Sequence, residues 1–224
     1  MQESESATTR AYEHIRDGII EGRYATDEML GESGLAAELS MSRTPVRAAL
    51  VRLQEEQWIT IYPKRGALVR GLGDRAIADL SEARYILETA AVQRADPGQM
   101  ETLAGTLTRV IAEQQAALET QDVHRFVDLT TAFHRSFVEV CGNQVLLELS
   151  DRLADRQRYM LFRLGGRLLE QCQLILAEHR ELVEALQAGD PSRFADGLRK
   201  HITDVHTERA APVPPMDAAG ADRA

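Results

Sequence analysis

The segment that most constrains the fold of this chain is residues 42–53, SRTPVRAALVRL, which have the pattern of a short amphipathic helix. Ser42 is a residue type that commonly caps a helix N-terminus with its side chain. Pro45 would be the third helical residue, where its missing N–H removes no helical hydrogen bond. The apolar positions recur at helical spacing and form one face: Val46, Ala49, Leu50 and Leu53.

A second face of this predicted helix carries two arginines near its N-terminal end. Arg43 and Arg47 are four residues apart, and Thr44 lies beside them. Each guanidinium can donate two parallel hydrogen bonds to O6 and N7 of a guanine in the major groove of DNA. For these twelve residues alone, a solvated surface helix is an equal alternative. The flanking segments decide between the two.

The flanking segments predict a winged helix-turn-helix within the first 71 residues. Residues 33–39 form an amphipathic two-turn helix before the arginine-bearing helix, and residues 9–21 form another in front of that. Residues 58–62 and 67–70 have strand character on either side of a turn at residues 63–66. In such a module the second helix of the pair enters the major groove and the hairpin, or wing, flanks it.

This segment resembles the N-terminal domain of the GntR family of bacterial transcription regulators. The resemblance lies in EGRY (21–24), GLAAELSMSRTPVRAALVRLQEEQWI (34–59) and PKRGALV (63–69). It implies that a homodimer binds a palindromic operator in double-stranded DNA. We expect Arg43 and Arg47 to read base edges, with the other contacts going to phosphate or to the minor groove. The predicted DNA-binding residues are Ser42, Arg43, Thr44, Arg47, Arg52, Lys64, Arg65 and Gly66.

The distribution of charge matters more here than its total. The 224 residues carry a formal net charge of −9, which is unusual for a DNA-binding protein. Residues 36–71, however, hold six basic and three acidic residues, a local net charge of +3. The two cysteines show no paired spacing, and no apolar run reaches the length of about 18–20 residues that a membrane span needs. We therefore expect a cytoplasmic protein without a membrane segment.

After a boundary at residues 71–73, helical periodicity continues without strand character. The expected helices cover about 74–95, 98–121, 123–141, 144–163, 168–188 and 191–208. Asp74 is a plausible N-cap for the first of them. The predicted fold class is thus mainly α, a winged helix-turn-helix (1–71) followed by an all-α antiparallel bundle (74–209). A Pro/Ala-rich tail (210–224) is expected to be disordered.

Three histidines of the bundle suggest a metal site. His179 lies 11 residues before Asp190 and His201 lies 11 residues after it. In a helical hairpin that turns at Asp190, both would lie about 16 Å from the turn, at the same height. Together with His134, they would form a reasonable first shell for a divalent transition metal, Zn or Ni. Any one of them alone would more often be a structural buried histidine. The remaining histidines are expected to be solvated: His14, His124 and His206.

The bundle resembles the FCD effector domain found in one branch of GntR regulators that sense organic acids. The matching pieces are ARYILE (83–88), AFHRSFVEVCGNQVLLEL (132–149), EHRELVEALQAGD (178–190) and the late His201. The resemblance implies a metal held by three histidines and by an Asp four residues before the first of them. Here that position is Thr130, and Asp128 would not share the face of His134. A three-histidine site is therefore implied, with Thr130 at its effector side.

Arg84 is the residue that the same resemblance assigns to the effector. A guanidinium fork opposite a metal suits a small carboxylate. The alternative is a surface ion pair between Arg84 and Glu88, one helical turn later.

We thus expect a transcription regulator, not an enzyme, that responds to a small carboxylate. One rival is a regulator whose signal is the metal itself. Another is a metal-dependent hydrolase with a DNA-binding appendage. Against it, the sequence shows no carboxylate general base within one turn of His134 and no nucleophile motif.

Overall fold

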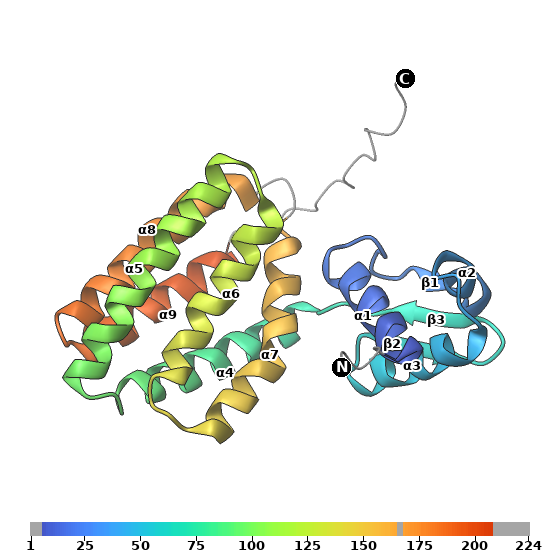
Figure 1. Ribbon diagram of the computed structural model, residues 1–224, viewed down its shortest axis with the longest axis horizontal. Coiled ribbons are helices and arrows are strands. Elements are labelled where there is room, and N and C mark those ends of the chain that lie inside the picture. The colour runs from blue at the N-terminus through green and yellow to red at the C-terminus, as the bar shows by residue number, and fades with distance from the viewer. Residues whose placement is uncertain (1–5, 165–167, 208–224) are drawn as a thin grey trace, which may run out of the picture. The chain divides into compact units, whose positions relative to one another are not determined.

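The structure is a computed structural model that describes residues 6–164 and 168–207 (Figure 1). The chain divides into two compact units, Met1–Ala76 and Ile77–Ala224. The division falls just inside a helix that begins at Asp74, a few residues after the boundary expected at 71–73. The tail expected to be disordered, residues 210–224, lies outside the described residues.

The N-terminal unit is the predicted winged helix-turn-helix. Its elements are α1 (Ala7–Ile20), β1 (Met29–Leu30), α2 (Glu32–Glu38), α3 (Arg43–Glu55), β2 (Ile59–Tyr62) and β3 (Gly66–Val69). The helices α1 and α3 pack together through their apolar faces, and α2 packs on α3. The buried side chains of α1 and α3 include Ala11, Ile15, Ile19, Val46, Ala49, Leu50 and Leu53. The apolar face expected for the arginine-bearing helix is therefore the core face of α3.

A short strand that the sequence did not indicate completes the wing. The sheet has the antiparallel order β1-β3-β2, with Leu30 opposite Ala67 and Tyr62 opposite Gly66. Two residues are too few to show an alternating pattern, so β1 could not be recognised from periodicity. Gly66 has a φ of +122°, and a Cβ there would lie 2.4 Å from the carbonyl oxygen of Leu30. Only glycine lets β1 approach β3 at this point.

The start of α3 differs in one detail from the prediction. Pro45 is the third helical residue, as expected. Ser42 has the extended backbone of an N-cap residue, but its side chain makes no capping hydrogen bond. The expected side-chain cap is therefore wrong. This helix end is exposed, so water can satisfy the first-turn N–H groups without the Ser42 hydroxyl.

The C-terminal unit is a helical bundle. Its elements are α4 (Asp74–Val92), α5 (Pro97–Glu119), α6 (Val123–Glu139), α7 (Gln144–Phe162), α8 (Leu168–Gln187) and α9 (Pro191–Thr207). Asp74 is the first helical residue rather than the N-cap that we expected. The helix α4 is shorter than expected because Asp96 caps α5, in a reciprocal capping box with Gln99. Within the described residues, no helix is both long and apolar enough to span a membrane.

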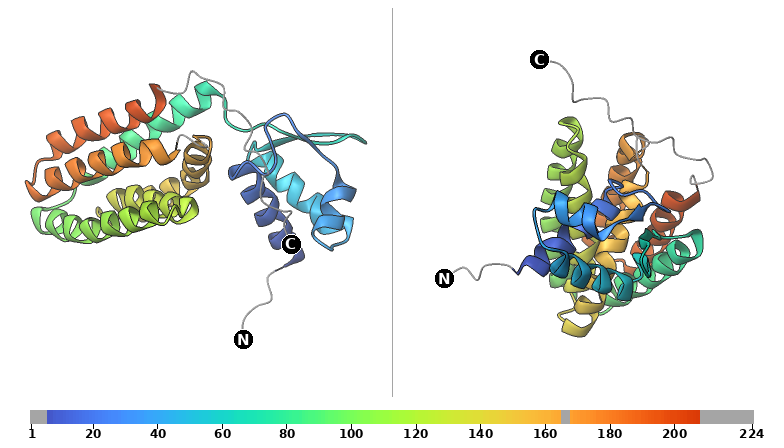
Figure 2. Two further views of the ribbon diagram at one scale, coloured as in Figure 1. Left: turned by 90° about the horizontal axis from the view of Figure 1, so that it is seen from above. Right: turned by 90° about the vertical axis from the view of Figure 1, so that its right-hand side faces the viewer.

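The helices of the C-terminal unit enclose one apolar core. Helix α5 packs against α6 and α8, α6 packs against α7, and α8 packs against α9 (Figure 2). The largest fully buried side chains of this unit are Phe126, Phe133, Phe137, Phe194 and Leu107. Phe133 and Phe137 lie on the inner face of α6, one turn apart, and His134 follows Phe133 on the same face. The sequence of α6 thus places the imidazole of His134 in the core.

Candidate metal centre and nucleic-acid interface

The two arginines predicted to read bases lie on the exposed face of α3. Arg43 and Arg47 have side-chain exposures of 60% and 63%. Both are held by the carboxylate of Glu32, the first residue of α2. Arg47 donates to it from Nε (3.1 Å) and Nη2 (2.8 Å), and Arg43 donates from Nη2 (3.0 Å). These hydrogen bonds lower the pKa of Glu32 to about 2. The sequence did not indicate Glu32.

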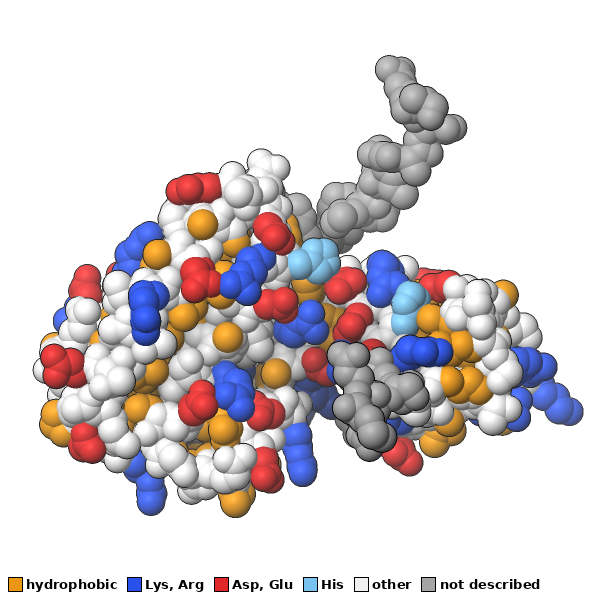
Figure 3. Space-filling model, viewed as in Figure 1, with side chains coloured by type: hydrophobic (Ala, Val, Ile, Leu, Met, Phe, Trp, Pro, Cys, Tyr) orange, Lys and Arg blue, Asp and Glu red, His pale blue; other side chains and the backbone are white. Residues whose placement is uncertain are grey.

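A groove of about 400 Å³ separates these arginines from the wing. Its other side is formed by the turn between β2 and β3, with Lys64, Arg65 and Gly66. Lys and Arg side chains gather at the end of the N-terminal unit that carries this turn (Figures 1 and 3). The structure therefore places the predicted recognition-helix residues and the predicted wing residues on the two walls of one groove.

The other residues predicted to contact DNA differ in their exposure and in their contacts with other side chains. Ser42 and Thr44 are exposed beside the arginines. Arg52, in contrast, lies 3.5 Å above the ring of Tyr12 and pairs with Glu56 at 3.1 Å. The hydroxyl of Tyr12 donates to the same carboxylate at 2.7 Å. Arg52 thus ties α3 to α1, and its contact with phosphate stays a prediction.

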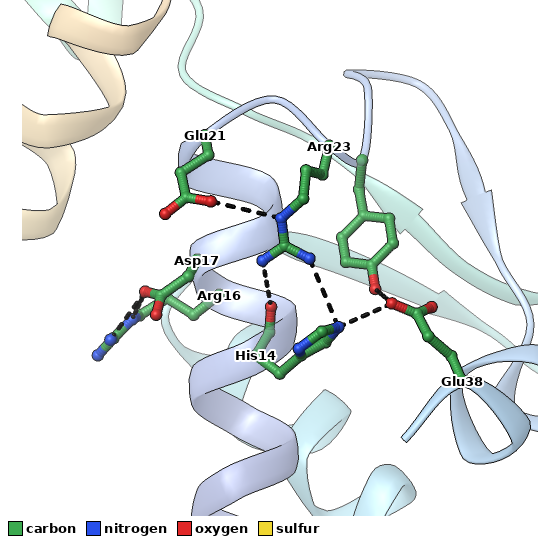
Figure 4. A network of polar contacts seen from close by, with 7 residues as sticks. His14, Arg16, Asp17, Glu21, Arg23 and Glu38 are labelled. Atoms are coloured by element: carbon green, nitrogen blue, oxygen red, sulfur yellow. Dashed lines mark hydrogen bonds and ion pairs between the residues drawn. The ribbon is translucent and has the colours of Figure 1, made fainter. Parts of the chain in front are cut away.

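A second polar network joins α1 to α2 (Figure 4). His14 Nε2 lies 2.7 Å from the carboxylate of Glu38, and the Tyr24 hydroxyl donates to the same oxygen at 2.8 Å. Arg23 donates to the carbonyl oxygen of His14 at 3.3 Å. The expectation that His14 is merely solvated was wrong, since the fold of α2 brings Glu38 to it. His124 is exposed, as expected, beside the ring of Phe162. The side chain of His206 lies outside the described part.

The three histidines predicted to bind metal converge inside the bundle. His134 comes from α6, His179 from α8 and His201 from α9, and all three are buried. One ring nitrogen from each can be chosen so that all lie within 4.8 Å of one another. Nε2 of His134 lies 3.2 Å from Nε2 of His201. The hairpin that turns at Asp190 places the rings of His179 and His201 5.1 Å apart. The closeness of His179 and His201 follows from their equal distance along the chain from Asp190. That the three histidines bind a metal stays a prediction.

Nδ1 of each of these rings contacts a buried polar side chain. Nδ1 of His134 lies 2.8 Å from Glu88, and Nδ1 of His201 lies 2.7 Å from Glu178. Nδ1 of His179 lies 3.0 Å from the amide oxygen of Gln114. An ionised carboxylate or an amide oxygen only accepts, so each Nδ1 carries the proton and each Nε2 presents a lone pair. Such acceptors behind metal-binding histidines fix both ring orientation and tautomer.

The chemistry of this donor set fits a divalent transition metal. Burial lowers the pKa of His134 and of His179 well below the ordinary value of 6.5, which keeps these rings neutral and able to ligate. Nε2 of His134 and Nε2 of His201 lie 3.2 Å apart, a separation that two ligands of one tetrahedral metal ion can have. Among the described residues, Nε2 of His179 has no hydrogen-bond partner despite its burial. Three neutral imidazoles suit Zn, Ni, Cu or Fe.

Arg84 lies at the edge of the histidine cluster and is buried. It donates from Nε to Glu88 at 3.0 Å, so the ion pair that we considered exists, but it lies inside the bundle rather than on its surface. Burial raises the pKa of Glu88, and the Arg84 guanidinium opposes that rise. Within the described part of the chain, Nη2 of Arg84 has no hydrogen-bond partner. This guanidinium therefore keeps donors for a further anion.

A small cavity joins Arg84 to the histidines. It is lined by Arg84, Thr130, His134, Gln157 and His201, with apolar side chains around them. Its free space is about 20 Å³, roughly room for one water molecule. The Thr130 hydroxyl accepts a hydrogen bond from Gln114 at 3.1 Å.

Asp128, which we expected to be outside the site, is indeed exposed. It pairs with Arg158 at 3.2 Å, on the outer face of α6.

Comparison with known proteins agrees with this architecture. Residues 79–204 match the family described as FCD domain, and residues 7–69 match bacterial regulatory proteins, gntR family. The gluconate operon transcriptional repressor of Bacillus subtilis (strain 168) is 27% identical over 199 residues, which cover 87% of this chain and 81% of the relative.

Solved structures show the same fold. A transcriptional regulator GntR from Rhodococcus sp. RHA1 has a TM-score of 0.75 at 22% identity, covering 91% of this chain and 97% of that one. A metal-free FCD domain of the regulator TM0439 has a TM-score of 0.50 at 21% identity, covering 62% of this chain and 94% of that one. The curated relatives are named as transcriptional repressors or regulators and not as enzymes, which agrees with the prediction of a non-enzyme and gives the hydrolase alternative no support. The chain belongs to the GntR family of DNA-binding transcription regulators, in the branch with an FCD effector domain.

Proposed function

We propose that this regulator holds a divalent transition metal through His134, His179 and His201 and senses a small carboxylate beside it. The observation that carries the metal proposal is the convergence of three buried imidazoles whose Nδ1 atoms are all engaged from behind. When bound, such a metal supplies a Lewis acid with positions open to a ligand oxygen. The metal-free state named for the FCD domain of TM0439 is consistent with a family that binds metal.

The carboxylate proposal rests on the charge and the donors around the cavity. Arg84 is buried and its Nη2 is unpaired among the described residues, so a carboxylate there would gain charge-assisted hydrogen bonds. Among the described residues, the buried charged groups are Arg84, Glu88 and Glu178; with Glu88 counted as ionised because it pairs with Arg84, they and a divalent ion give a net charge of +1. One carboxylate group would neutralise this charge in a region of low dielectric. We therefore propose a small acid that places a single carboxylate in the site.

The remaining parts of the proposal concern the assembly and the signal. We propose that the chain acts in the cytoplasm as a homodimer on a palindromic operator, since two-fold operators match two-fold proteins. Helix α4 is the connection between the domains, because it begins at Asp74, shortly after β3 ends at Val69, and carries Arg84. An acid that binds one arrangement of the DNA-binding domains better than the other would change operator affinity about 5–150-fold, a coupling of roughly 1–3 kcal/mol.

The metal proposal is tested by metal analysis of the full chain purified without a histidine tag. We expect about one equivalent of a transition metal per chain in the parent protein and a large loss in His179→Ala. His124→Ala, which changes an exposed histidine of α6, is the matched control. Equal metal in the parent and in His179→Ala, or none in either, would leave three structural histidines.

The effector proposal is tested on the metal-loaded protein by thermal unfolding against a panel of small carboxylic acids. We expect at least one monocarboxylic acid to raise the melting temperature, and the same acid to change operator affinity. The matching primary amide of that acid should do neither. If every acid acted no better than its amide, the carboxylate part of the proposal would fall and the metal part would remain.

A second candidate is that the metal itself is the signal. It is favoured by the cavity, whose free space of about 20 Å³ leaves little room for an organic molecule. The two candidates differ in the effect of chelation. If removal of the metal changes operator affinity as much as any acid does, the metal is the signal. If chelation changes only the response to the acid, the metal is part of the effector site.

A further inference from the structure

The groove between α3 and the wing contains a negative charge, which contacts both arginines predicted to read bases. Glu32 begins α2, and its side chain is 23% exposed, much less than those of Arg43 and Arg47. The carboxylate lines the same groove as Lys64 and Arg65 of the wing. An acidic group in this place is unexpected, because it reduces the attraction for the phosphates that supply most of the affinity for DNA.

The hydrogen bonds of Glu32 leave the reading edges of both arginines available. Arg47 uses Nε and one N–H of Nη2, which leaves both hydrogens of Nη1 and the second hydrogen of Nη2. That outer edge has the spacing of a fork for O6 and N7 of guanine. Arg43 uses a single N–H of Nη2, so most of its donors are also available. The Glu32 carboxylate therefore accepts hydrogen bonds from one edge of each guanidinium and leaves the other edge uncovered.

The charge of this cluster is fixed at physiological pH. The hydrogen bonds from Arg47 and Arg43 keep the pKa of Glu32 far below neutrality. The three side chains together therefore carry a charge of +1, where two lone arginines would carry +2. A lone arginine can reach a phosphate equally well on any sequence. An arginine held by a fixed carboxylate keeps its orientation and loses part of its attraction for phosphate.

We propose that Glu32 is a positioning residue that sets the sequence specificity of DNA binding. It holds the free guanidinium edges of Arg43 and Arg47 toward the base edges, and its charge weakens binding to unrelated sequences. Because the two long side chains are already ordered, binding to the operator does not incur the conformational-entropy cost of immobilising them. The opposite possibility is that Glu32 is a competitor, which must release the arginines before DNA can bind.

The test compares the full-length parent with Glu32→Gln, Glu32→Asp and a matched control, Glu55→Gln, which removes an exposed carboxylate from the same domain. Binding is measured as a function of salt concentration on two duplexes. One is a duplex that the parent protein enriches from a randomised library, and the other is a scrambled duplex of the same length and composition. Thermal unfolding of each variant reports any structural effect separately.

For Glu32→Gln we expect affinity for the enriched duplex to fall on the order of tenfold. Affinity for the scrambled duplex should rise, with a salt dependence steeper by about one unit. Glu32→Asp keeps the charge but is one methylene shorter. It should lose affinity for the enriched duplex while binding the scrambled duplex like the parent. Glu55→Gln should change both duplexes alike, so its specificity ratio should equal that of the parent.

Two outcomes would overturn the proposal. If Glu32→Gln bound the enriched duplex more tightly than the parent does, Glu32 would be a competitor for the arginines. If both affinities stayed at parent values and only the melting temperature fell, the contacts of Glu32 would be a structural ion pair between α2 and α3. A reduced specificity ratio in Glu32→Asp, without a change in charge, is the result that a purely electrostatic or structural role would not produce.

Discussion

Replacing Glu178 by Gln should weaken metal binding without removing any of the three histidines. Glu178 is 3% exposed, and its Oε2 lies 2.7 Å from Nδ1 of His201. A glutamine can still accept the Nδ1 proton through its amide oxygen, so the ring keeps its orientation and tautomer. What is lost is the full negative charge, which makes the imidazole a stronger donor to a cation. Loss of such a partner usually lowers metal affinity about 10–100-fold.

The lower end of that range applies here because the hydrogen bond survives. We expect Glu178→Gln to bind Zn about tenfold more weakly than the parent, or about 1.4 kcal/mol. The assay is a titration of tag-free, metal-stripped protein with Zn in competition with a fluorescent chelator at pH 7.5. The control is Glu181→Gln, an exposed carboxylate on the same helix that lies 3.8 Å from Lys200. It removes the same charge and should bind Zn with parent affinity.

Thermal unfolding gives an independent reading of the same effect. A tenfold weaker affinity should reduce the stabilisation by saturating Zn by about 1.4 kcal/mol, while the metal-free proteins unfold alike. Equal Zn affinity in the parent and in Glu178→Gln would refute the reasoning, because the carboxylate would then contribute nothing to the donor strength of His201. An equal loss in Glu181→Gln would assign the effect to overall charge instead.

Three further predictions test other parts of the structure. Arg47→Ala should cost about 1–3 kcal/mol on an operator duplex, whereas Lys64→Ala should weaken all duplexes alike and lower the salt slope by about one. Arg84→Met should destabilise the protein by about 3–5 kcal/mol in urea, since it leaves Glu88 uncompensated, and a second change, Glu88→Gln, should restore most of that loss. The depressed pKa of Glu32 should add about 1 kcal/mol of stability above pH 4.5, which is lost as the pH falls to about 2 and is absent in Glu32→Gln.

The winged helix could be predicted because its signals are local. The apolar positions of α3 recur within one short segment, and the arginines lie on the opposite face by the same periodicity. The two residues of β1 carry no such signal, and the strand exists only because Gly66 lets the chain approach Leu30. Glu32 could not be recognised either. It is an ordinary acidic residue at a helix start until α2 turns it toward Arg47.

The histidine cluster was predictable in part for a geometric reason. A helical hairpin brings residues at equal distance from its turn to the same height, so His179 and His201 had to lie close together. The partners behind them follow no such rule. Gln114 lies 65 positions before His179, and Glu88 lies 46 positions before His134. Only the packing of α4 and α5 against the other helices reveals them, since a polar residue in a helix is usually solvated.

Thr130 stands where the resemblance to the FCD domain implied an aspartate, and its hydrogen bond links it to the predicted metal site. Thr130 accepts a hydrogen bond from Nε2 of Gln114, and Oε1 of that amide faces Nδ1 of His179. The Thr130 hydroxyl thus accepts from the Gln114 amide in the orientation that leaves Oε1 of Gln114 to accept the Nδ1 proton of His179. An aspartate could accept from Gln114 as well, but it would add a negative charge beside the histidines. Threonine accepts the same hydrogen bond and omits the charge, and under the proposed function a bound carboxylate would supply that negative charge.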